Sequence, residues 1–214
     1  MPPQARRPTE GPPLTTSPTA FDARDDLTAP RAAGRLALAA AVTLVLSGIA
    51  LALFFSNVAY VFGPINDVLL GLTFVLVVPA IIAVRRLAVP VTGSWITWLS
   101  WAAVAGIGLL VVGQLLLVAG LMSLGLSFIT LSVGILPFLA WTVAIGILSL
   151  RGRLLTRAVG LWGVGMAVAL VGAAATWGLL PIDAWAAFGV VLLLAFTGFL
   201  VVLGRTLQGE TLRR

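Results

Sequence analysis

The chain has 214 residues, of which 60% are hydrophobic and only 9% are charged, and its mean hydropathy is +1.14. A soluble domain carries roughly a quarter charged residues. The composition therefore excludes a soluble globular enzyme, a disordered protein and a secreted disulfide scaffold. It predicts an all-α, polytopic membrane protein, a bundle of transmembrane helices.

Absent residue types exclude further chemistry. Without Cys or His the chain has no thiolate nucleophile, no disulfide, no haem-binding imidazole and no histidine base. All 13 basic residues are Arg, so a lysine Schiff base is impossible. No phosphate-binding loop, metal motif or hydrolase elbow occurs. We expect a protein that is not an enzyme and that has no catalytic residues, metal or cofactor.

The ends of the chain differ from its middle. Residues 1–34 contain seven of the 12 prolines and many charged residues, a composition that cannot bury enough apolar area to fold. We expect a disordered cytoplasmic tail there, a membrane domain over 35–205 and a short basic tail over 206–214. The first apolar run is too long for a signal peptide, so we expect it to remain in the mature protein.

The apolar runs between the charges predict six spans, near 36–56, 65–84, 95–121, 127–150, 158–179 and 184–204. The second starts beside Pro64, which suits a helix start, and stops at Arg85-Arg86. Residues 87–150 carry no charge. One helix of that length would measure about 96 Å, against a bilayer core of about 30 Å. Two spans joined by a turn at 122–127 fit instead.

The arginines determine the expected orientation. Six spans place all 13 on one side, in the N-terminal tail, in 85–94, in 151–157 and at the C-terminus. The positive-inside rule then predicts that both termini are cytoplasmic, in a bacterial plasma (inner) membrane. It also accounts for the net charge of +6 without nucleic acid. The arginines beside the membrane are expected to meet anionic lipid headgroups: Arg85, Arg86, Arg151, Arg153 and Arg157.

Three polar residues are candidates for a site. Asp67 and Asp183 each fall in the expected first turn of a helix that starts at the outer face. There a carboxylate either caps the helix or contributes to an outer-face site for a cation or proton. Gln114 is the most polar residue deep in a span. It either forms an inter-helix hydrogen bond, with Ser127, Thr130 or Ser132 as partners, or lines a small polar cavity.

Prolines and small residues add structural expectations. Pro79 and Pro137 fall within spans and should kink them, either as ordinary membrane-helix features or as parts of a gate. Small residues recur every four positions on spans one, four and five, which permits close packing within the bundle or in a homo- or hetero-oligomer. They are Ala37 and Ala41, Ala140 and Ala144, and Gly165, Ala169 and Ala173.

The layout resembles a loose group of uncharacterised bacterial six-span integral membrane proteins. The resembling pieces are Phe62-Gly63-Pro64-Ile65-Asn66-Asp67, Pro79 within the second span, and the stretches 106–120 and 153–165. They extend the resemblance over about 36–205. Members of the group have no agreed activity, so the resemblance implies a fold and a location but no site residue.

Two functions from different classes remain open. The first is a non-enzymatic accessory or structural membrane protein, which predicts a closed bundle without a polar cavity. The second is a small transporter or channel for a lipophilic or small uncharged solute. It predicts a continuous cavity that touches Gln114 and a proline kink.

Overall fold

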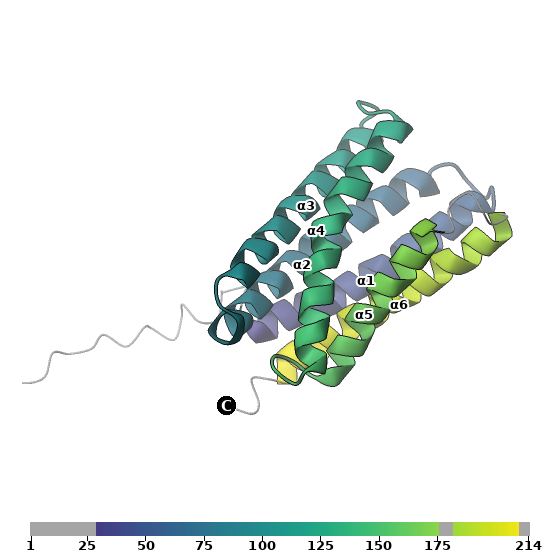
Figure 1. Ribbon diagram of the computed structural model, residues 1–214. Helices are drawn as coiled ribbons and strands as arrows, with labels where there is room; N and C mark the ends of the chain where they lie inside the picture. Colours follow the sequence, from purple (N-terminus) through teal and green to yellow (C-terminus); the bar gives the residue numbers. More distant parts are fainter. Residues whose placement is uncertain (1–28, 176–181, 210–214) are drawn as a thin grey trace, which may run out of the picture.

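The computed structural model describes residues 29–175 and 182–209, and it describes their side chains except at 124, 128, 173–175 and 182–188. Six α-helices make up this part of the chain, which confirms the predicted helical membrane bundle (Figure 1). Five are long and apolar enough to cross a membrane, and α5 is a shorter apolar helix over its described side chains. The helices are α1 (Pro30–Phe55), α2 (Phe62–Thr92), α3 (Trp95–Val118), α4 (Leu124–Leu150), α5 (Arg157–Ala175) and α6 (Ile182–Gly209).

Several helices extend beyond the expected spans. α1 begins at Pro30, so residues 30–34 of the expected tail are helical, and Pro at a first helical position loses no hydrogen bond. α2 continues through Arg85-Arg86 and Pro90 to Thr92. α6 continues past the expected boundary at 205 to Gly209. Charge limits how much of a helix lies in hydrocarbon, but it does not end the helix.

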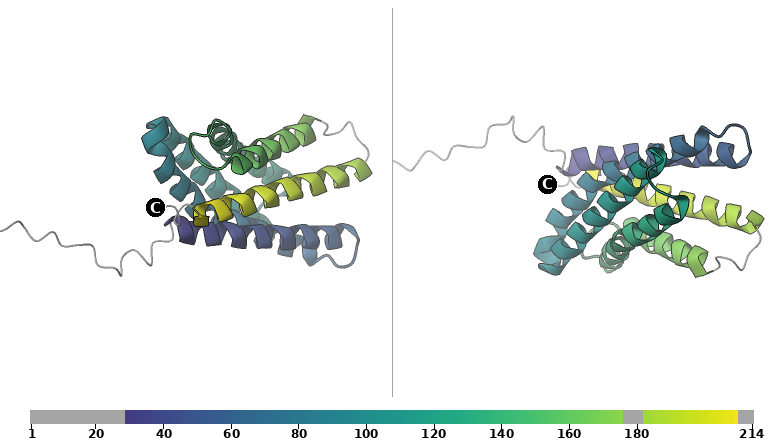
Figure 2. Two further views of the ribbon diagram at one scale, coloured as in Figure 1. Left: turned by 90° about the horizontal axis from the view of Figure 1, so that it is seen from below. Right: turned by 90° about the horizontal axis from the view of Figure 1, so that it is seen from above.

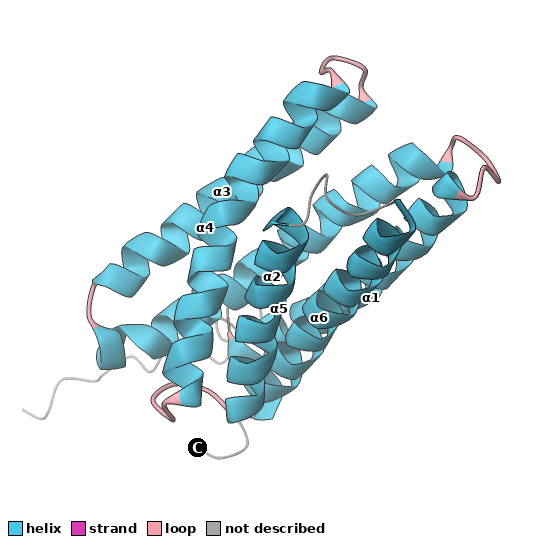
Figure 3. Ribbon diagram, turned by 45° about the vertical axis from the view of Figure 1, so that its right-hand side comes forward, coloured by secondary structure: helices cyan, strands magenta, loops and turns pink. Residues whose placement is uncertain are grey.

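The six helices form a closed ring. Each helix packs against its neighbours in the chain, and α6 packs back against α1. Consecutive helices run in opposite directions, so the start of α1 and the end of α6 lie at the same end of the bundle (Figure 2). The loops that the structure describes, from the α1–α2 loop to the α4–α5 loop, alternate between the two ends (Figure 3).

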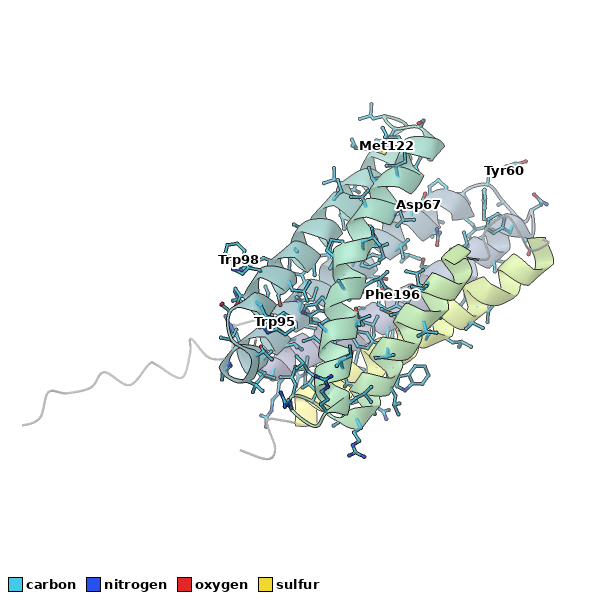
Figure 4. The ribbon with its side chains drawn as sticks, in the orientation of Figure 1. Tyr60, Asp67, Trp95, Trp98, Met122 and Phe196 are labelled. Atoms are coloured by element: carbon cyan, nitrogen blue, oxygen red, sulfur yellow. The ribbon has the colours of Figure 1, made fainter. Side chains whose placement is uncertain are left out.

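An aromatic cluster fills the centre of this ring. Phe74, Phe138 and Phe196 come from α2, α4 and α6, and their ring centroids lie 5.7 to 5.9 Å apart. Trp141 stacks on Phe138 at 6.0 Å, and its indole N–H donates to Ser100 Oγ at 3.2 Å. Figure 4 shows Phe196 between the two ends of the bundle. Because the three phenylalanines come from alternate helices, they connect opposite sides of the ring.

Paired glycines bring the helices close at three crossings. A Cβ on either glycine of a pair would meet the backbone carbonyl oxygen of the other. Two pairs lie near the end of the bundle where α1 begins and α6 ends, and one lies near the middle of α3. In Figures 1 and 3 the α3–α4 hairpin diverges from the α1–α2 hairpin toward the other end. The pairs are Gly34 with Gly204, Gly146 with Gly160, and Gly106 with Gly134.

Charge separates the two ends. The described arginines all lie toward the end of the bundle where α1 begins and α6 ends, which we call the Arg end: Arg31, Arg35, Arg85, Arg86, Arg151, Arg153, Arg157 and Arg205. Trp95 and Trp98 lie there too, with 47% and 77% of their surfaces exposed (Figure 4). Asp67 lies in the opposite half, which we call the outer half.

The small-residue faces serve two purposes. Ala37 and Ala41 are buried within the bundle, at 0% and 4% exposure. Ala140 and Gly165 are exposed, and a Cβ on Gly165 would meet no atom within 4 Å. The α1 face is therefore used for internal packing, whereas those of α4 and α5 include surface positions.

Candidate functional site between α2 and α3

Buried polar side chains mark the outer half of the bundle. The buried apolar residues lie mostly in the middle and at the Arg end, whereas the residues buried in the outer half include Ser47, Asn66, Gln114 and Ser127. Polar groups in a membrane interior need partners. Ser100, Thr142 and Ser149 are also buried, toward the Arg end, and each has a hydrogen-bond partner. The two buried amide side chains, Asn66 and Gln114, both lie in the outer half.

Asp67 does not cap a helix, which corrects one interpretation of the sequence. The chain turns at Ser56-Asn57, where Asn57 takes a left-handed conformation with φ 57°, and α2 begins at Phe62. Asp67 therefore lies in the second turn, and no side chain caps the start of α2. Pro64, read as the start of the span, is the third helical residue. The whole segment from Phe62 to Asp67 therefore lies within α2.

Asn66 holds Asp67 in place through a link to α1. Ser47 Oγ donates to Asn66 Oδ1 at 2.7 Å, and Asn66 Nδ2 donates to Asp67 Oδ1 at 3.2 Å. Deeper in the bundle, the hydroxyls of Thr43 and Thr73 lie 2.8 Å apart. Sequence reasoning missed Asn66 because this segment was interpreted as the start of a helix, so a contact between Asn66 and another helix was not expected. The available signal was the spacing of these polar residues, one turn apart on α1 and two turns apart on α2.

Gln114 is buried without its expected inter-helix partner. It is 6% exposed, and its Oε1 has no hydrogen-bond partner among the described residues. Thr130, one of the expected partners, donates instead to the carbonyl oxygen of Ser127 at 2.9 Å. Membrane Thr residues commonly bond their own helix in this way. Gln114 does line a pocket, but the wall of this pocket is mostly aliphatic, which differs from the small polar cavity of the alternative interpretation.

A pocket of about 180 Å³ between α2 and α3 brings Asp67 and Gln114 to one site. Neither Pro79 nor Pro137 lines it. Five of its aliphatic residues are 40% exposed or more, so it opens on the lipid-facing side of the bundle. The side chain of Asp183, the third candidate, lies outside the described residues. The lining residues are Asp67, Val68, Gly71, Leu72, Val75, Val111, Gln114, Leu115 and Val118.

The pocket contains acceptors in an aliphatic wall. The Asp67 carboxylate and the Gln114 carbonyl both accept hydrogen bonds, and the described arginines lie at the other end of the bundle. Among the described residues, no three Asp or Glu side chains come together as metal ligands. The arrangement is suited to binding a hydrogen-bond donor group.

Replacing Gln114 with leucine is expected to change stability by about 1 kcal/mol or less. The substitution removes an acceptor that has no partner and fills a similar volume. Thermal unfolding of the purified protein in a mild detergent measures the change. A large loss of stability would show that the amide makes an essential internal contact.

A second pocket lies at the Arg end, between α3 and α4. It has a volume of about 500 Å³. Trp95 and Arg151 line it together with Ala140, Val143, Ala144, Ile147 and Leu148. Nearby on α2, the guanidinium carbon of Arg85 lies 5.0 Å from the centre of the Trp101 ring. This end therefore pairs cationic and indole groups with an apolar surface.

Comparison with known proteins gives no family for the chain. No protein-family model matches it, no curated protein matches it, and no solved structure matches it.

Proposed function

We propose that the chain is a non-enzymatic accessory or structural protein of the bacterial plasma (inner) membrane. The observation that carries this proposal is the aromatic centre of the ring. Phe74, Phe138 and Phe196 are 2%, 0% and 9% exposed, so the bundle is packed where a channel would need space. The lack of Cys, His and Lys supports a role without catalysis.

In this proposal the Arg end faces the cytoplasm. Its support is the location of the described arginines at one end, together with the exposed indoles of Trp95 and Trp98. Positive charge is retained on the cytoplasmic side of membrane proteins, and Trp prefers the membrane interface. Both termini are then cytoplasmic.

Anionic lipids are the proposed partners of the Arg end. The pocket lined by Trp95 and Arg151 has an aliphatic wall that suits an acyl chain, and Arg151 at its edge suits a phosphate. Each arginine near an anionic surface contributes on the order of 1 kcal/mol.

An accessory role also needs a surface for a partner helix. Gly165 on α5 offers one, because it is exposed and has open space around it. Small residues allow a second helix to approach closely in a membrane.

The alternative is a small transporter for a lipophilic or small uncharged solute. One observation favours it: Gln114 lines a pocket, as that function predicts. The pocket lies on the lipid-facing side and does not reach Pro79 or Pro137, so it differs from the continuous cavity that the alternative requires.

Two measurements distinguish these functions. In proteoliposomes, glycerol and urea are expected to cross no faster than in protein-free liposomes. A faster rate that Gln114→Leu reduces, with the fold intact, would replace the proposal with the transporter. Cross-linking in native membranes before extraction is expected to give an assembly that Gly165→Leu disrupts. The matched change at exposed Gly108, which also has open space, should leave the assembly intact.

A further inference from the structure

The pocket between α2 and α3 has a polar outer end and an apolar inner end. Along α2, Asp67 lies about 7 Å from the start of the helix and Val75 about 20 Å, at 1.5 Å per residue. Along α3, which runs the other way, Gln114 lies about 6 Å from the last residue and Val111 deeper. The acceptors thus lie near the level of lipid headgroups, and the aliphatic residues lie within the hydrocarbon.

Gln114 lines this pocket, and its side-chain carbonyl oxygen is a buried acceptor that no described residue satisfies. The Gln114 side chain is 6% exposed and therefore 94% buried. Its Oε1 has no hydrogen-bond partner among the described residues. A buried acceptor without a partner costs about 1–3 kcal/mol. A donor from outside the chain that entered the pocket would remove this cost.

Asp67 determines the charge of that donor. Its carboxylate is fixed by Asn66, which Ser47 holds in turn, so it is oriented before any ligand arrives. Among the described residues no arginine shares its half of the bundle, so its negative charge is not matched by a cation there. A positively charged N–H donor fits both Asp67 and Gln114, because an ammonium group has donors and no acceptor.

Gly71 makes the space for the ligand. It lies one turn below Asp67 and lines the pocket, and a Cβ at this position would meet no atom within 4 Å. The volume of about 180 Å³ equals about six water molecules at 30 Å³ each, enough for an ammonium group and a few carbons. Further carbons would continue along the exposed aliphatic groove beside Leu72 and Val75 into the bilayer.

We propose that this pocket binds the ammonium group of an amphiphile, with its hydrocarbon body in the bilayer. The ammonium donates to the Asp67 carboxylate and to Gln114 Oε1. Two sources have this chemistry, a phosphatidylethanolamine lipid and a free long-chain primary amine. The proposal goes beyond an accessory role and does not depend on it.

The test uses the full chain in phosphatidylcholine nanodiscs titrated with decylamine, with thermal unfolding as the readout. Decylamine is expected to raise the unfolding temperature of the wild type, because a ligand of the native state stabilises it. Decanol, with the same chain and no charge, should have little effect. Asp67→Asn and Gly71→Leu are expected to weaken the decylamine response at least about tenfold in concentration. Gly108→Leu, a matched change at an open glycine outside the pocket, should keep it.

A second arm identifies the source. The protein is transferred to nanodiscs that contain phosphatidylcholine and phosphatidylethanolamine, and the lipids that remain bound are measured by native mass spectrometry. Enrichment of phosphatidylethanolamine that decylamine displaces and Asp67→Asn abolishes assigns the lipid. A decylamine response without such enrichment assigns the free amine. If Gly71→Leu does not fold, Gly71→Ala takes its place with a partial loss expected.

Two results would overturn the proposal. An equal decylamine response in the wild type and in folded Gly71→Leu would place binding elsewhere. A loss in Gly71→Leu with full binding retained by Asp67→Asn would show that packing alone holds the ligand and that the ammonium assignment is wrong.

Discussion

Replacing Gly106 with alanine is expected to destabilise the bundle by about 3 kcal/mol, whereas the same change at Gly108, two residues further along α3, should stabilise it by up to about 1 kcal/mol. A Cβ on Gly106 would run into the carbonyl oxygen of Gly134 and lie 3.3 Å from Pro137 Cγ. Backbone cannot yield as a flexible side chain does, so α3 and α4 must separate. At Gly108 a Cβ meets no atom within 4 Å, and only the higher helix propensity of alanine remains.

Unfolding by steric trapping or by heat in a mild detergent measures both changes. Because the two substitutions are chemically identical and lie on one helix, any difference in sign comes from the crossing itself. Equal effects at the two positions would contradict the close approach of α3 and α4.

Phe138→Ala is expected to cost about 3–5 kcal/mol. Phe138 is fully buried and contacts Phe74, Phe196 and Trp141. In a membrane the packing contacts rather than the exclusion of water hold helices together, and this substitution removes them from three helices at once.

Phe55→Ala is the control, since Phe55 is 71% exposed at the end of α1. Its effect should remain below about 1 kcal/mol, as is usual away from the core. The same unfolding assay applies to both variants. A cost at Phe138 no larger than that at Phe55 would show that the centre of the ring is not packed as described.

The architecture was predictable because membrane spans depend on two coarse properties, apolar length and the location of charge. Both can be read from 36–204, where only seven charged residues occur. The ends of the helices were less predictable. Arg85 and Arg86 were taken as the end of a span, yet α2 continues past them. The free-energy cost of a charged residue depends on its depth in the bilayer, and the charge does not prevent the backbone from continuing as a helix.

The candidate site was predictable only in part. Asp67 and Gln114 were identified because each is an isolated polar residue in an apolar run. Their shared pocket depends on the angle at which α2 and α3 pack, which no local pattern encodes. The role of Asn66 was missed because α2 begins two residues before Pro64, so a residue read as part of the helix start lies within the helix and contacts α1.

Single-cysteine labelling tests the central claim, a six-span bundle whose Arg end is cytoplasmic, most directly. The chain has no native Cys, and Gly125 and Arg153 are exposed at opposite ends of α4 and its following loop. A membrane-impermeant maleimide is expected to label Gly125→Cys on intact cells and Arg153→Cys only after the membrane is opened. Labelling of Arg153→Cys on intact cells, or of Gly125→Cys only after the membrane is opened, would contradict the account.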